Sequence, residues 1–210
     1  MRSFIGLDLA GNTKMALESW REQALPDVPR REALVQQPAK KRRGGKNTPP
    51  VTAQPYAVPT VNLHMTLCFL GAITPRQHEA LIAEMDALTY QPFDLHLDTA
   101  GVWNGPKILF AAPTEPPQEL LELARGVRKA ARAAGLHVEG KEYKPHVTLV
   151  RKAGPTLPIP LMTPDIQCHF ADFHLFESVS TPTGVTYPIR HTWQLRHQLS
   201  VREKLRRGLI

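Results

Sequence analysis

Residues 61–70 read VNLHMTLCFL, a run that contains enough apolar side chains for a central β-strand. Side chains alternate between the two faces of a strand, so we expect His64, Thr66 and Cys68 on one face. The opposite face is expected to hold Met65, Leu67 and Phe69. Polar side chains on an otherwise apolar strand are costly when they are buried without partners. The face that carries His64 is therefore expected to line a hydrated cleft.

The same pattern, H-x-T-L, returns at residues 146–149 (HVTL), inside a second expected strand at residues 145–150. His146 and Thr148 again share a face. One such motif is a weak signal, because a single strand histidine is more often a core residue with a backbone hydrogen bond than a catalyst. Two independent matches in a chain of this length arise by chance on the order of once in a few thousand sequences. The repetition therefore indicates a functional pair.

Two histidines and two threonines in this pattern suit the cleavage of a phosphodiester. In-line displacement at phosphorus needs a base that takes a proton from water and an acid that protonates the leaving oxygen on the opposite side. The unperturbed pKa of histidine, about 6.5, allows one ring to be neutral and the other protonated near neutrality, so no metal ion is required to activate water. The hydroxyl groups of Thr66 and Thr148 can donate hydrogen bonds to the non-bridging phosphate oxygens, where charge develops. We expect no metal and no cofactor.

The rest of the chain mixes hairpin signals with a few amphipathic helices, which predicts an α+β fold because no regular βαβ alternation is sustained. Asn12 is expected to cap a first helix that ends near residue 24. The apolar side of that helix is expected to hold Met15, Leu17 and Trp20. A second helix is expected after the capping box of residues 74–77, and a third over residues 117–134. Further strands are expected at residues 3–8, 93–97, 107–112, 170–177 and 185–189.

Two turns are expected between these strands. Residues 104–106 (NGP) are expected to join segments 93–97 and 107–112 as a hairpin. Residues 181–184 (TPTG) form the second turn signal.

Composition indicates a cytoplasmic globular protein. The chain has 210 residues, of which 42% are hydrophobic, which is enough to form a core without disulfides or metal. Its two cysteines, Cys68 and Cys168, are far apart and show no metal-binding spacing, so we expect neither a disulfide framework nor a zinc site. No apolar run reaches the length of a membrane span.

The positive charge is concentrated in one segment. The formal net charge is +7, which favours a polyanionic partner such as RNA. Residues 26–59 contain seven lysines and arginines against two acidic side chains, together with seven prolines. We interpret this segment as a basic, proline-rich loop insertion, which would either add RNA affinity or be a tolerated surface insertion.

The two motifs in their contexts, NLHMTLCFLG and KPHVTLVRKA, resemble those of the 2H phosphoesterases, and specifically the bacterial RNA 2′,3′-cyclic phosphodiesterases, also named 2′-5′ RNA ligases. The resemblance extends to SFIGLDLA at the start, FDLHLDTAGVW in the middle, and DFHLFES with GVTYPIRHTWQL near the end. It implies one bilobal domain over residues 1–210, in which two pseudo-symmetric antiparallel sheets backed by helices surround a central cleft. The basic insertion at about residues 26–59 departs from the family's usual short connection.

The resemblance also implies an activity and a set of site residues. Family members hydrolyse RNA ends that carry a 2′,3′-cyclic phosphate to a 2′-phosphate, and some join tRNA halves reversibly through a 2′-5′ linkage. By position, His64 and His146 would be the catalytic pair, and Thr66 and Thr148 the phosphate ligands. Arg151, in the pattern H-x-T-L-x-R, would be a further phosphate contact. We expect a monomer that binds RNA and no membrane.

Three aromatic residues are candidates for stacking on a terminal base, namely Phe4, Trp103 and Tyr187. Core packing is the more common role for residues such as Phe4 and Trp103. Two other functions stay open: an RNA-binding module without turnover, and a phosphodiesterase for a small cyclic nucleotide or a 2′-5′ oligonucleotide. The sequence does not tell which histidine is the acid.

Overall fold

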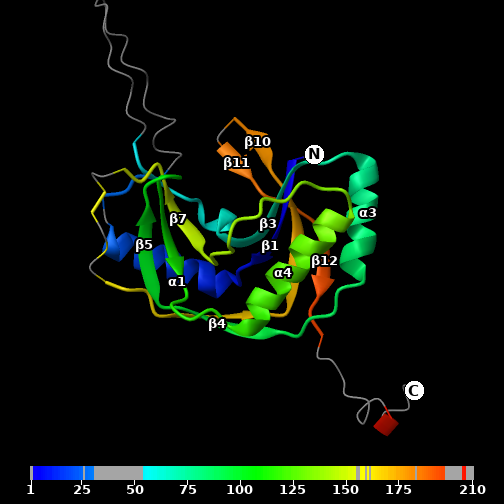
Figure 1. The fold of residues 1–210 in the computed structure, drawn as a ribbon. Helices are drawn as coiled ribbons and strands as arrows, with labels where there is room; N and C mark the ends of the chain where they lie inside the picture. The colour runs from blue at the N-terminus through cyan, green and yellow to red at the C-terminus, as the bar shows by residue number, and fades with distance from the viewer. Residues whose placement is uncertain are drawn as a thin grey trace, which may run out of the picture.

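The computed structural model describes residues 2–25, 27–30, 54–154, 157–158, 160, 162–182, 184–196 and 205–206. Most of the basic insertion expected at residues 26–59, including its lysine and arginine run, lies outside these residues. The described chain combines helices with antiparallel strands, which confirms the α+β class (Figure 1).

The main feature of the fold is one large sheet with the strand order β12-β9-β1-β3-β7-β6-β5, in which β2 adds a further pairing to β7. All of its neighbouring strands are antiparallel. The strands of the first half are β12 (Ile189–Gln194), β9 (Asp172–Glu177), β1 (Arg2–Asp8) and β3 (His64–Ala72). Those of the second half are β7 (Val147–Arg151), β6 (Ile108–Ala112), β5 (Thr99–Trp103) and the short β2 (Tyr56–Ala57).

The two halves are continuous rather than separate sheets. They meet at β3 and β7, the two H-x-T-L strands, through the single residue pair Met65 and Val147. Figure 1 shows this junction at the middle of the molecule, with β5 and β12 on opposite sides of it. The two halves correspond to the two antiparallel sheets that were expected, and they are joined because the central strands come close enough to pair once before they diverge.

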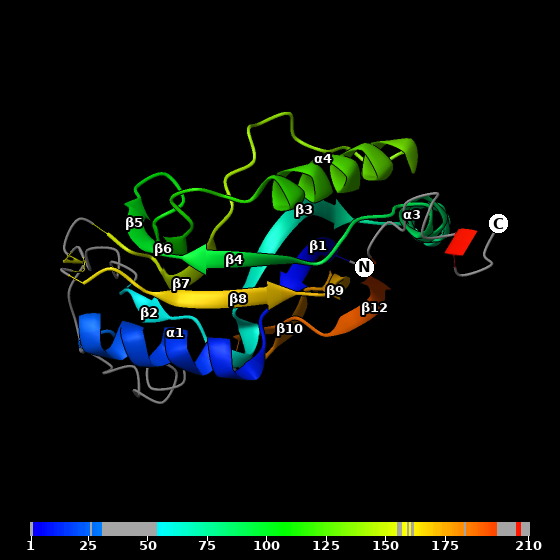
Figure 2. The ribbon, with the colours of Figure 1, turned by 90° about the horizontal axis from the view of Figure 1, so that it is seen from below.

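A second layer covers the face of the sheet on which Met65 and Val147 are fully buried. It contains the helices α1 (Gly11–Ala24) and α4 (Gln118–Ala133), with the ladder of β4 (Phe93–Leu97) and β8 (Ile166–Phe170) between them (Figure 2). Helix α3 (Pro75–Asp86) packs beside α4, and α4 contacts β3. The short hairpin of β10 (Val179–Thr181) and β11 (Gly184–Thr186) and the 3₁₀ helix η1 (Thr60–Asn62) complete the described elements.

Local signals predicted the helices well. At α3, the backbone N–H of Gln77 donates to the Thr74 hydroxyl and the backbone N–H of Thr74 donates to the Gln77 side chain, which confirms the capping box. Helix α4 buries the expected stripe, and Gly135 follows it with φ +76°.

The start of α1 differs from the expectation. The helix begins at Gly11, so Asn12 lies inside the first turn and its side chain accepts only from the neighbouring Thr13 N–H. Met15 is 68% exposed, whereas Leu17 and Trp20 are buried as expected. Met15 and Leu17 are two residues apart, which is about 200° around a helix, so the two side chains cannot share the buried face.

The expected hairpin between segments 93–97 and 107–112 is wrong. Strand β4 pairs with β8, which is distant in sequence, while β6 pairs with β5. The turn expected at residues 104–106 therefore joins β5 to β6 instead. Likewise, the expected strand at 185–189 is divided between β11 and β12, because the chain leaves one ladder for another at Pro188, whose carbonyl accepts from the Glu177 N–H.

None of the described helices is long and apolar enough to cross a membrane.

Candidate active site

A cleft of about 1270 Å³ lies over the central strands β3 and β7, and Arg128 of α4 and the segment 137–144 also border it. Its walls include every residue that the sequence singled out for the site: His64, His146, Thr66, Thr148, Arg151, Tyr187 and Phe4. Both halves of the sheet contribute, and the β10–β11 hairpin borders the cleft as well. Residues far apart in the sequence are thus gathered around one cavity.

The register at the junction explains why the two motifs share this cavity. Met65 and Val147 face each other and both are fully buried. Alternation then turns the motif histidines and threonines to the other face, where all four side chains are half-buried. Because the strands are antiparallel, the register directs His64 toward Thr148 and His146 toward Thr66. The result is an approximately two-fold arrangement of His and Thr around the junction.

Each motif strand carries a β-bulge at its leucine. Ile5 pairs with Cys68 and Gly6 with Thr66, so Leu67 has no partner on β1. In the second half, Leu109 pairs with Val150 and Phe110 with Thr148, which leaves Leu149 without a partner on β6. A bulge inserts one extra residue and reverses the alternation after it. The two halves therefore share an irregularity at equivalent positions.

The bulges correct two expectations about side-chain direction. Cys68 is 4% exposed and packs in the hydrophobic core, where burial raises the pKa of its thiol to about 11, although it also borders the cleft. Phe69 does not lie on the opposite face: it is 71% exposed and lines the cleft. The bulge at Leu149 likewise brings Arg151 to the cleft, where strict alternation would have put it on the face opposite His146. Phe69 and Arg151 thus occupy equivalent positions in the two halves.

Backbone carbonyls orient both imidazole rings in the same way. The Nδ1 atom of His64 lies 2.7 Å from the carbonyl oxygen of Asn62. The Nδ1 atom of His146 lies 2.8 Å from the carbonyl oxygen of Lys144, again two residues earlier. A carbonyl only accepts, so in each ring Nδ1 carries the hydrogen and Nε2 keeps the lone pair. Each neutral ring can therefore act as a base through Nε2.

Aromatic rings pack around both histidines. His64 stacks on Phe4 at a centroid distance of 4.7 Å and meets the edge of Tyr187 at 5.0 Å. Phe4 also stacks on Phe176 at 4.9 Å, and only 4% of it is exposed. Phe4 therefore supports the imidazole rather than offering a face to a base, which is the packing role weighed for it above. In the second half, Trp103 is half-buried and lies 4.6 Å from the ring of His146.

Burial favours the neutral form of both histidines in the free protein. It lowers the pKa of His64 to about 4, and it lowers the pKa of His146 as well. The positive charge of Arg151 lowers the pKa of both rings further, which shows that this guanidinium lies close to both. Lowered pKa values favour the neutral form of both rings in the empty cleft, so the proton that the expected acid carries depends on what the cleft binds. A bound anion would raise both pKa values by its negative charge.

Sequence reasoning missed Asn62 as well as Phe69. The buried Asn62 accepts from His64 through its backbone, and its side-chain amide donates to the carbonyl oxygen of Val185 in the β10–β11 hairpin at 2.7 Å. No sequence pattern marks a residue that acts through its main chain. Within the described residues, no group of three His, Cys, Asp or Glu side chains is placed to hold a metal ion.

Comparisons with known proteins agree with this geometry. A family model described as the 2′-5′ RNA ligase superfamily matches residues 31–180. The RNA 2′,3′-cyclic phosphodiesterase of Escherichia coli is 30% identical over 149 residues, which cover 70% of this chain and 82% of that protein. The enzyme of the same name from Thermus thermophilus is 30% identical over 184 residues, which cover 79% of this chain and 84% of that one.

Solved structures show the same fold. The crystal structure of Escherichia coli LigT complexed with 3′-AMP superposes with a TM-score of 0.76 at 25% identity, and covers 93% of this chain and 98% of LigT. A Thermus thermophilus crystal structure superposes with a TM-score of 0.71 at 24% identity, over 95% of this chain and 100% of that one.

Proposed function

Because this chain belongs to the 2′-5′ RNA ligase superfamily, we propose that it hydrolyses RNA ends that carry a 2′,3′-cyclic phosphate, with His64 and His146 as the acid–base pair. The observation that carries the proposal is the matched orientation of the two rings. Both have Nδ1 bound to the carbonyl two residues earlier, and both line the cleft beside Arg151. This arrangement leaves one basic nitrogen on each side of the junction.

The reaction follows from these groups. One neutral histidine takes a proton from water through Nε2 as the water oxygen bonds to phosphorus. The bond from phosphorus to the ribose O3′ breaks, and the other histidine, protonated when the anionic substrate enters, gives its proton to O3′. The product carries a 2′-phosphate and a 3′-hydroxyl. The two rings end with their protonation states exchanged.

The remaining polar groups act on the phosphate. The hydroxyls of Thr66 and Thr148 donate to the non-bridging oxygens, and the Arg151 guanidinium balances the charge that grows on them. Burial strengthens these interactions because the local dielectric constant is low.

The size of the cleft supports an RNA end over a small cyclic nucleotide as the substrate. Its volume of about 1270 Å³ exceeds the roughly 300–1,000 Å³ of typical small-molecule sites. The net charge of +7 also favours a longer polyanion, because lysine and arginine gain affinity from each phosphate that they neutralise. Two buried groups that titrate near one cation favour turnover over binding alone.

The proposal extends to the setting of the enzyme. It acts as a single bilobal domain and as a monomer, since one chain supplies both motifs. Both cysteines are free thiols, which fits the reducing cytoplasm. RNA is its partner, with tRNA halves as candidate ends for the reverse, ligating reaction.

The test is incubation of the purified protein with an oligoribonucleotide that ends in a 2′,3′-cyclic phosphate. We expect a product that co-migrates with the 2′-phosphate standard and not with the 3′-phosphate standard. Preincubation with EDTA is expected to leave the rate unchanged. Binding without any product would favour the RNA-binding module, and a higher kcat/KM for 2′,3′-cyclic AMP than for the oligonucleotide would favour the small-nucleotide reading.

A further inference from the structure

A buried arginine lies behind the second motif strand. Arg21, near the end of α1, is 3% exposed. Burial is the main cause of the lowering of its pKa from the usual value, and the carboxylates of Glu18 and Glu22 oppose that lowering. A buried guanidinium is costly unless its N–H groups are hydrogen-bonded. Its contacts therefore indicate why it is there.

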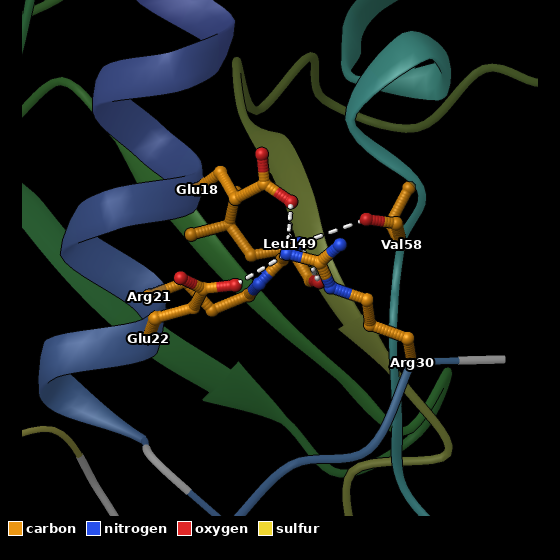
Figure 3. Close-up of polar contacts among 6 residues, drawn as sticks. All are labelled: Glu18, Arg21, Glu22, Arg30, Val58 and Leu149. Carbon is orange, nitrogen blue, oxygen red and sulfur yellow. Dashed lines mark hydrogen bonds and ion pairs between the residues drawn. The ribbon is translucent and has the colours of Figure 1, made fainter. Parts of the chain in front are cut away.

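Arg21 holds the bulge of the second motif. Its Nη1 atom donates to the carbonyl oxygen of Val58 at 2.8 Å and lies 3.4 Å from that of Leu149 (Figure 3). The backbone N–H of Val58 donates to the same Leu149 oxygen at 2.9 Å. Leu149 is the residue that the bulge leaves without a partner on β6. The contacts of Arg21 thus converge on the irregular point of β7.

The topology explains why a side-chain donor is needed at this point. Strands β3 and β7 share only the pair Met65 and Val147, and beyond it β2 takes the place of β3 beside β7. Val58 lies just past the end of β2. Main-chain carbonyls where ladders change partners must find other donors, because an unpaired buried carbonyl is costly. Arg21 supplies the donor to the Val58 carbonyl at 2.8 Å and adds a longer contact of 3.4 Å to the Leu149 carbonyl, which also accepts from the Val58 N–H.

Three charged side chains, Glu18, Glu22 and Arg30, lie near Arg21 and are not among the contacts of the bulge. Glu18 Oε1 lies 3.6 Å from Nη2 of Arg21 and 3.1 Å from Nη2 of Arg30. Arg30 also contacts Glu22 at 2.7 Å, and its side chain is 62% exposed. Arg30 is therefore a matched control. It contacts the same Glu18 carboxylate as Arg21 does, and its replacement leaves the contacts of Arg21 to Val58 and Leu149 in place.

We propose that Arg21 is a positioning residue, which maintains the Leu149 bulge from behind the sheet and thereby keeps the Arg151 guanidinium in the cleft beside His146. Without the bulge, alternation from Thr148 would turn Arg151 to the opposite face. The expected loss of kcat/KM rests on the function proposed above. The expected displacement of the Arg151 guanidinium does not depend on that function.

The test compares Arg21→Met with Arg30→Met. Methionine keeps an unbranched apolar stem in the buried site, and replacing a buried ion by an apolar group of similar volume is often tolerated. Arg21→Met is expected to lower kcat/KM for the cyclic-phosphate RNA by about 10-fold to about 100-fold, as misplacement of a catalytic group does. Arg30→Met is expected to match the wild type. Should Arg21→Met fail to fold, Arg21→Gln, which retains a single N–H donor group, takes its place.

Two readouts separate positioning from loss of stability. In the background of Arg151→Met, the Arg21 substitution is expected to lower kcat/KM by less than about 2-fold, because the two residues act through one group. The pKa of His146, followed by NMR titration of its ring, is expected to rise both in Arg21→Met and in Arg151→Met, because the charge of Arg151 lowers it. Independent losses in the double variant, or an unchanged His146 titration, would overturn the proposal.

The two proposals fail in different ways. A wild-type protein that gives no product refutes the phosphodiesterase function, and the His146 titration still decides the role of Arg21. A wild-type enzyme that is active, with Arg21→Met equally active, refutes only the positioning role.

Discussion

The carbonyl oxygen of Asn62 lies 2.7 Å from Nδ1 of His64, two residues later in the chain. The same asparagine ties η1 to the hairpin beside the cleft through Val185. Asn62→Ala keeps the carbonyl but removes this tie. We expect kcat/KM to fall about 10-fold and the free energy of unfolding to fall by about 1 kcal/mol, because the half-buried carbonyl of Val185 loses its donor. Asn12→Ala, on the exposed start of α1, is the control and is expected to change neither value.

The two histidines should be equally indispensable. His64→Ala and His146→Ala are each expected to lower kcat at least ~100-fold, the lower end of acid–base contributions. The double variant should be little worse than either single one, since the rings act as a unit. His96→Ala, which removes only a surface contact to Asp165, should retain full activity. Near-normal turnover in either cleft variant would refute the assignment.

The pH dependence of kcat/KM should be shifted to acid. The free enzyme must carry one proton on the pair, and burial lowers the pKa of His64 to about 4 and that of His146 below its usual value. The bell-shaped profile is therefore expected to have its maximum below about pH 6.5, which is the unperturbed pKa of histidine. Initial rates at low substrate between about pH 4 and about pH 9 measure it. A maximum above pH 7 would contradict this prediction.

The same burial should make stability depend on pH through His64. Its pKa is about 4 in the folded protein and about 6.5 in the unfolded chain. The unfolded chain thus binds more protons between these values, and the contribution to stability, fully present above pH 6.5, is lost as the pH falls through about 4. The expected slope reaches at most about 1.4 kcal/mol per pH unit. Denaturant titrations of the wild type and His64→Gln measure it, because other groups cancel in the difference.

Phe69 should bind a base of the substrate. It is 71% exposed and lines the cleft. Phe69→Ala is expected to raise KM by a factor between about 5 and about 150, which corresponds to the loss of about 1–3 kcal/mol of stacking on a nucleobase. Phe69→Trp should keep KM near the wild-type value. Met15→Ala, which removes an equally exposed apolar side chain on α1, should have no effect on KM. An unchanged KM in Phe69→Ala would exclude this contact.

The sequence predicted the parts of this molecule that depend on local pattern. Apolar alternation identified the strands of His64 and His146, and capping residues identified the start of α3. The repetition of H-x-T-L was enough to identify His64 and His146 as the candidate pair from the sequence alone. The structure places both copies at one cavity, because β3 and β7 pair at Met65 and Val147.

What could not be predicted depends on pairing between distant strands. The bulges at Leu67 and Leu149 exist only in relation to β1 and β6, so strict alternation misplaced Cys68 and Phe69. The partner of β4 lies about seventy residues away in the chain, whereas the turn signal favoured a nearby one. Asn62 acts on His64 through its main chain, and Arg21 acts on a carbonyl oxygen, so neither leaves a side-chain motif.

The equivalence of Phe69 and Arg151 has a consequence for the way in which a nucleic acid lies in the cleft. The rest of the His and Thr arrangement is the same when the molecule is turned about the junction, and on its own it would accept a strand in either direction. The aromatic ring of Phe69 at one position and the guanidinium of Arg151 at the equivalent position make the two ends of the cleft chemically different. A nucleotide, which is flat at its base and negative at its phosphate, then fits the cleft better in one sense than in the other, and this difference adds to the one between Tyr187 beside His64 and Trp103 beside His146.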